Sequence, residues 1–210
     1  MIQLTEADNM TPAPVLQHSP EGVRIQQHAI QPARGRELDL RYRDWPGLDV
    51  ETLALQVAAA WSSPLTASLE SPHRLVPGEA RQGRRGCVGH ILDGLRADLL
   101  FERKHRSGQL KTYCYPVLFV DRVLGGSHRQ FRINQQQPLG LAYAKAIAHY
   151  AKIRGLDKDE IGTALSRAPH RGLFLDVMTH RTSQGYSIPR ERVMAKLGVA
   201  TAGLEDVSAA

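Results

Sequence analysis

The chain has 210 residues, two cysteines and a formal net charge of +6. This length suits one principal domain, and two cysteines are too few for a disulfide framework. The first residues are acidic and polar, and no stretch approaches the roughly 18 apolar residues of a membrane span, so we expect a cytoplasmic protein with no membrane partner.

Residues 1–86 are expected to divide into an arm, a segment that packs on the core and a linker. Residues 1–35 contain four prolines and no sustained period, which predicts a mobile arm. Residues 36–70 are expected to pack on the core with an alternating edge strand and then a helix, for which Asp49 is a suitable N-cap. Segment 71–86, rich in Pro, Gly and Arg, is predicted to be a basic linker or loop.

Residues 87–155 are predicted to form a basic domain of a sheet and a helix. Four strand-like runs follow one another across short glycine-bearing turns, which favours an antiparallel meander. Pro116 in the third run predicts that this strand lies at an edge or carries a bulge. The expected fold class is therefore α+β, a meander of three to four strands packed on helices, with a frayed tail at 199–210. Further short helices are expected at 156–198, and Asp157 is a candidate N-cap for the first of them.

The helix predicted at residues 138–154 is rich in alanine. Its apolar side chains fall in one arc of a helical wheel, which indicates a buttress for the sheet. They are Leu139, Ala142, Tyr143, Ala146, Ile147, Tyr150 and Ile153. Lys145 and Lys152 lie on the opposite side and are too few to read a DNA groove.

Positive charge is concentrated in residues 71–135, which hold twelve Lys and Arg against five acids, whereas the other 145 residues sum to −1. This pattern is typical of a polyanion-binding surface, and double-stranded DNA is the expected partner. A solvated basic face without a partner is the alternative. The candidate nucleic-acid-binding residues are Arg84, Arg85, Arg103, Lys104, Arg106, Lys111, Arg129 and Arg132.

Alternation along the last strand places Arg132 with Gln130 and Asn134 on one side and Arg129 on the other. The first side offers the arginine and amide groups that read guanine and adenine. The basic residues around the turn at 107–108 suit contacts with the duplex backbone.

Two other functions stay open. Asp93 or Asp98, followed by Glu102 and Lys104, resembles the acid-x-Lys core of restriction-endonuclease-like nucleases, in which two carboxylates hold a divalent metal ion. An acidic protein surface would also pair with the basic segment.

Metal and cofactor signals are otherwise sparse. Cys87, His90, His105 and Cys114 supply an inventory of four zinc ligands, but the second pair lacks the close spacing of a zinc finger, so we expect packing or solvated roles. No nucleotide-binding loop is present, and no cofactor is expected.

Residues 98–155 combine arginine-bearing strands, a last strand of the "FRI" kind and the helix "PLGLAYAKAIAHYAKIRG". This arrangement resembles the plant ethylene-response-factor DNA-binding domain and its relatives in phages and mobile elements. The resemblance implies that Arg103, Lys111 and Arg132 face DNA from the sheet. We therefore predict a non-catalytic DNA-binding regulatory or accessory protein, with homodimer formation left open.

Overall fold

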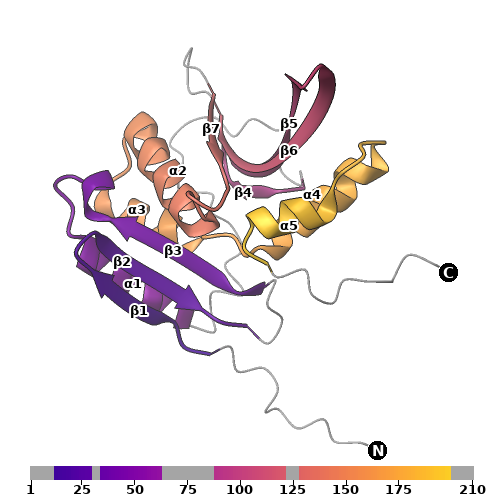
Figure 1. The fold of residues 1–210 in the computed structure, drawn as a ribbon. Coiled ribbons are helices and arrows are strands. Elements are labelled where there is room, and N and C mark those ends of the chain that lie inside the picture. Colours follow the sequence, from indigo (N-terminus) through magenta and orange to yellow (C-terminus); the bar gives the residue numbers. More distant parts are fainter. Residues whose placement is uncertain (1–11, 30–33, 63–87, 122–127, 200–210) are drawn as a thin grey trace, which may run out of the picture.

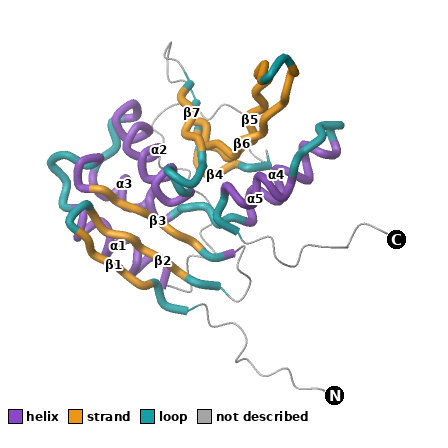
Figure 2. Tube along the Cα trace, in the orientation of Figure 1, coloured by secondary structure: helices purple, strands orange, loops and turns teal. Residues whose placement is uncertain are grey.

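The structure, a computed structural model, describes residues 12–29, 34–62, 88–121 and 128–199. It has the predicted α+β fold, with two antiparallel sheets and five α-helices in those ranges (Figures 1 and 2). The expected linker at 71–86 lies outside the described residues, as do nearly all of the expected tail and the first part of the expected arm.

The first sheet contains β1 (Val15–Ser19), β2 (Gly22–Gln27) and β3 (Arg36–Arg41) in that order. The prediction of a mobile arm is therefore wrong for residues 15–27, which form a hairpin. Val23 and Ile25 alternate into the core and are fully buried, and this burial holds the hairpin on the fold. As predicted, β3 lies at an edge of its sheet.

Helix α1 (Val50–Ser62) follows the 3-10 turn at Tyr42–Asp44 and packs against the first sheet. The Asp49 carboxylate accepts hydrogen bonds from the backbone N–H groups of Glu51 and Thr52, which confirms the predicted N-cap. These bonds, with one from the Thr52 hydroxyl as the largest influence, lower the pKa of Asp49.

The second sheet contains β4 (His90–Leu92), β5 (Leu95–Arg106), β6 (Gln109–Val120) and β7 (Arg129–Arg132). Its strand order is the order in the chain, and every neighbouring pair is antiparallel, so the predicted meander is confirmed.

Pro116 lies where β6 changes from an inner strand to an edge. The N–H of Ile133 donates to the Pro116 carbonyl at 2.9 Å, but proline has no N–H to return, and the pairing with β7 ends there. Beyond Pro116, towards residue 109, β6 pairs with β5 alone. The edge prediction thus holds for this half of β6 and is wrong for residues 117–120.

Helix α2 (Leu139–Arg154) lies between the two sheets (Figure 1) and contacts β3 as well as β6 and β7. The predicted apolar arc is buried, with Ile153 partly exposed, and this agrees with its expected role as a buttress. Several residues outside that arc are buried too, because α2 has a sheet on more than one side. They are Gly140, Leu141, Ala144 and Ala151.

Three shorter helices complete the described fold: α3 (Lys158–Ser166), α4 (Gly172–Ser183) and α5 (Arg190–Lys196). The predicted cap of α3 is present, since Asp157 and Glu160 form a reciprocal capping box. Helix α4 packs against β5, and α5 packs against β6. Among the described helices, none combines the length and apolar character that crossing a bilayer requires.

Candidate nucleic-acid interface

The far end of the β5–β6 hairpin is a basic, two-stranded projection, residues 103–112, which we call the ribbon (Figure 1). Its ten residues are all exposed, and none of them is acidic. The turn residues Ser107 and Gly108 both have positive φ, 53° and 75°, as a two-residue I′ turn requires. The ribbon carries four of the candidate residues: Arg103, Lys104, Arg106 and Lys111.

Strand register decides which basic residues share a face. Lys104 is paired with Lys111, and the β6–β7 register places Arg132 on that same face. Arg103 is paired with Thr112 and points to the other face. The expectation that Arg103 shares a face with Lys111 and Arg132 is therefore wrong, because the two-residue turn fixes a register that the sequence did not reveal.

Arg129 lies on the α2 side of β7, opposite Arg132, as alternation predicted. Its guanidinium stands 5.3 Å from the centre of the Phe131 ring, and its Nη1 is 3.4 Å from Nδ1 of His149 on α2. Burial lowers the pKa of His149, and the charges of Arg129 and Lys152 add to this effect. Near pH 7, His149 is therefore neutral, and Arg129 supplies the positive charge on the α2 side of β7.

Glu102 on β5 is the acid closest to the candidate cations in the described sheet. Its carboxylate lies 2.8 Å from the Lys104 ammonium and also contacts the guanidinium of Arg132. The hydrogen bond from Lys104 is the largest influence lowering the pKa of Glu102, and the charge of Arg132 acts in the same direction. One carboxylate therefore partly neutralises two candidate DNA ligands, a role that the sequence analysis did not assign.

The three carboxylates of the nuclease alternative do not converge, although Lys104 contacts Glu102. Arg181 on α4 holds the Asp98 carboxylate, with Nη2 at 2.8 Å from both oxygens. Asp93 is exposed in the β4–β5 turn, where its backbone carbonyl accepts from the Tyr150 hydroxyl. Asp98 and Glu102 are four residues apart on one strand, roughly 13 Å, whereas metal ligands lie about 2.0–2.6 Å from the ion.

The possible zinc ligands are also dispersed. Cys87 lies outside the described residues. His90 is paired with Arg96, nine residues before His105 on β5, which corresponds to roughly 30 Å along the strand. Cys114 is buried, and burial raises its pKa to about 11. Within the described ranges, no three His, Cys, Asp or Glu side chains are grouped to hold a metal ion.

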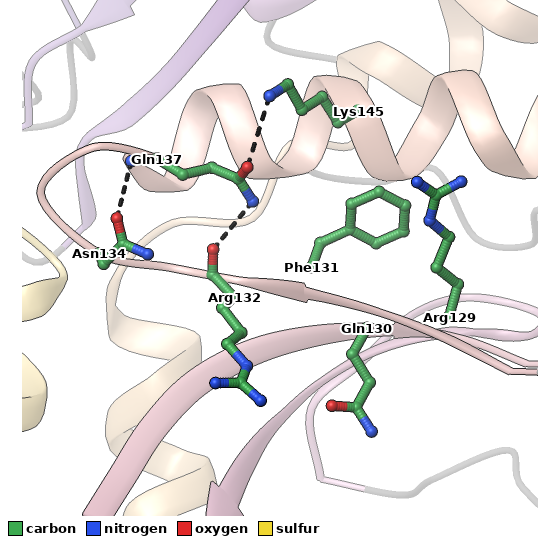
Figure 3. A pocket seen from close by; sticks show the side chains of 7 residues that line it. All are labelled: Arg129, Gln130, Phe131, Arg132, Asn134, Gln137 and Lys145. Atoms are coloured by element: carbon green, nitrogen blue, oxygen red, sulfur yellow. Dashed lines mark hydrogen bonds between the residues drawn. The ribbon is translucent and has the colours of Figure 1, made fainter.

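A shallow pocket of about 360 Å³ runs beside the free edge of β7 (Figure 3). It brings Arg129 and Arg132 together with Lys145 of α2, and no carboxylate lines it. The full lining is Arg129, Gln130, Phe131, Arg132, Asn134, Gln137 and Lys145. Lys145 was not among the predicted site residues, because helical periodicity shows that it lies off the apolar arc but not which sheet edge it faces.

Arg84 and Arg85 lie outside the described residues, so the structure places six of the eight candidate residues. It divides these six between the ribbon and the edge of β7. Comparisons with protein-family models, curated proteins and solved structures found no match. The function is therefore argued from the geometry of this chain.

Proposed function

We propose that this protein binds double-stranded DNA through the ribbon and catalyses no reaction. It would act as a cytoplasmic regulatory or accessory protein, as a monomer or a homodimer, in a phage or other mobile element. The observation that carries the proposal is the ribbon itself: a projecting hairpin of ten exposed residues with four Lys and Arg and no acid.

The shape of the ribbon fits this partner. The major groove of B-DNA is about 12 Å wide and admits a two-stranded β-ribbon. Basic residues leave the ribbon on both faces, with Lys104 and Lys111 on one face and Arg103 on the other. A ribbon in the groove would thus present cations to the phosphate backbones on both sides, which fixes its position on the duplex.

The family resemblance is part of the proposal. It is supported by the strand order β5, β6, β7 and by α2, which follows β7 and packs on the sheet. Arg132 lies on the face of β7 away from the α2 side, where the resemblance expects DNA. The long ribbon adds a contact surface beyond that face.

An acidic protein is the competing partner, since carboxylates would pair with the same cations. The groove-sized ribbon favours the duplex, because an ordinary acidic surface does not require a projection of this kind.

The test measures binding of a fluorescent duplex by anisotropy between 50 and 200 mM salt. If the ribbon neutralises about four phosphates, log K should fall with log salt at a slope of about −3.6. The double variant Arg103→Ala/Lys111→Ala should reduce that slope by about 1.8. The matched control is Arg43→Ala/Lys158→Ala, which removes two exposed charges far from the ribbon in sequence and should retain the slope.

Absence of binding at low salt, or equal behaviour of the two double variants, would overturn the proposal. Binding of polyglutamate without binding of duplex would replace DNA with an acidic protein partner. Each titration is repeated with magnesium, since duplex cleavage that disappears in Glu102→Gln would favour the nuclease alternative.

A further inference from the structure

We infer that the pocket beside β7 is a phosphate-binding site, and that it takes a backbone phosphate of the nucleic acid held by the ribbon. The identity of this phosphate rests on the proposed function. The affinity of the pocket for phosphate does not depend on that function.

The backbone of β7 presents donors to the pocket. The bond from Ile133 N–H to Pro116 fixes the pairing with β6, and in an antiparallel pair the hydrogen-bonded residues alternate. The N–H groups of Gln130 and Arg132 therefore point away from β6, towards the free edge. The Arg132 carbonyl accepts a bond from Gln137 Nε2 at 2.9 Å, so this acceptor is already covered.

Three cations surround that edge. Side chains leave a strand on alternate faces, so those of an edge strand border its free edge from both sides. Figure 3 shows Arg129 and Lys145 on the α2 side of the strand and Arg132 on the other. No carboxylate lines the pocket, but Glu102 outside it partly neutralises Arg132, so an anion at this edge is attracted mainly from the α2 side, by Arg129 and Lys145.

Phosphate suits the pocket better than an added β-strand does. A strand pairing with β7 needs acceptors as well as donors, and the Arg132 carbonyl is covered by Gln137. β7 has only four residues and carries arginines, features that discourage edge pairing. A phosphate accepts hydrogen bonds only, and arginine and lysine are its usual ligands.

The pocket and the ribbon are placed to contact one duplex. Arg132 is paired with Val117, and Gln109 at the ribbon turn lies eight positions before Val117 on β6. The two sites therefore lie within about 27 Å along the strand. This is less than one turn of a duplex, about 34 Å, so a phosphate in the pocket would orient the ribbon on DNA.

The first experiment follows thermal melting of the full chain with inorganic pyrophosphate against sodium chloride of equal ionic strength. A ligand that binds the folded chain raises Tm, by about 3–6 °C at ten times its Kd for a chain of this length. Lys145→Gln should lose most of this rise. Lys152→Gln is the matched control, because Lys152 is an exposed lysine of the same helix that does not line the pocket.

The second experiment repeats the duplex titration with the same two variants. Lys145→Gln should weaken binding about three- to ten-fold at low salt and reduce the salt slope by about 0.9, the value of one phosphate. Duplexes with and without a 5′-phosphate distinguish the source of the phosphate. Equal affinities indicate a phosphate within the duplex, whereas a preference for the phosphorylated end indicates a terminal one and overturns the backbone assignment.

Failures of the two proposals give different results. If pyrophosphate raises Tm no more than chloride, or if both lysine variants respond alike, the pocket is not a phosphate site. If duplex binding depends on the ribbon while Lys145→Gln has no effect in either experiment, only the pocket inference fails. If pyrophosphate binds through Lys145 but duplex does not bind, the proposed function and the nucleic-acid source fail together.

Discussion

The guanidinium of Arg132 on β7 reaches across β6 to the carboxylate of Glu102 on β5, and it passes the ring of Tyr115 at 5.3 Å from the ring centre. Lys104 approaches the same carboxylate to 2.8 Å. If the protein binds DNA as proposed, a phosphate would need these two cations, and Glu102 would compete with nucleic acid for them.

Glu102→Gln is therefore expected to raise affinity for duplex DNA by about two- to five-fold, which corresponds to about 0.4–1 kcal/mol for a partly exposed ion pair. Anisotropy at a fixed salt concentration measures this change. Asp159→Asn removes one exposed acid on α3 and serves as the control, with little change expected. Weaker duplex binding by Glu102→Gln than by wild type would show that Glu102 positions the cations rather than competing for them.

The next prediction concerns the close approach of α2 to β3 at Gly140. A Cβ there would lie 2.8 Å from the Glu37 carbonyl oxygen and 3.0 Å from the Leu38 Cα, both backbone atoms. Gly140→Ala should lower the free energy of unfolding by about 1–3 kcal/mol, although alanine favours helices. Urea denaturation measures the difference.

Gly162→Ala on α3 is the matched control. Its Cβ would meet Oε1 of Gln56 at 2.7 Å, but this atom ends a flexible side chain and can move. We expect unchanged stability or a gain of up to about 1 kcal/mol. Equal losses in the two alanine variants would contradict the tight contact between α2 and β3.

Tyr150 joins α2 to the β4–β5 turn. Its ring is fully buried, and its hydroxyl donates to the Asp93 carbonyl at 2.9 Å. Tyr150→Ala should lower stability by about 2–4 kcal/mol through the cavity it leaves. Tyr150→Phe retains the ring and should lose only about 0.5–1.5 kcal/mol. A similar loss for both variants in urea melts would show that ring packing is unimportant.

The last prediction concerns the pKa of His149, which burial and the charge of Arg129 lower below the ordinary value of about 6.5. Titration followed by NMR should find this lowered pKa, and Arg129→Gln should raise it part of the way. Lys152→Gln should raise it less, because the charge of Lys152 has the smaller influence. A wild-type pKa above 6.5 would show that burial and the nearby charges do not lower the pKa of His149.

The sign of the accompanying stability change follows from proton binding. Between the lowered pKa and about 6.5, the unfolded chain binds more protons at His149 than the folded chain does. The contribution of His149 is therefore fully present above pH 6.5 and is lost as the pH falls. His149→Gln should flatten part of this pH dependence in urea denaturation.

Local signals predicted much of the fold. Asp49 and Asp157 cap helices by binding backbone groups of neighbouring residues, so both caps could be predicted from adjacent residues. The antiparallel meander could be predicted in the same way, because the connections between its strands are short. The hairpin at residues 15–27 was missed because β1 is largely exposed and shows no clear apolar alternation. Its place in the sheet depends on β2 and on the distant helix α1.

The candidate site was predictable as a concentration of charge but not as a geometry. The basic residues of the ribbon stood out in the sequence, whereas the face of Arg103 depended on the register. The place of Lys145 in the pocket could not be predicted, because it depends on how α2 packs beside the edge of β7. Similarly, nothing local indicated that Glu102 pairs with Arg132, since β6 lies between their strands.

The position of α2 between the two sheets limits which part of this chain could fold as a separate fragment or be transferred to another protein. The helix covers β3 with one side and β6 and β7 with another, so neither sheet keeps its apolar surface covered without it. A fragment comprising residues 87–155 would expose the side of α2 that faces β3. The basic sheet with α2 is therefore not an independent unit, and a transfer of it to another protein would have to include the first sheet and α1 as well.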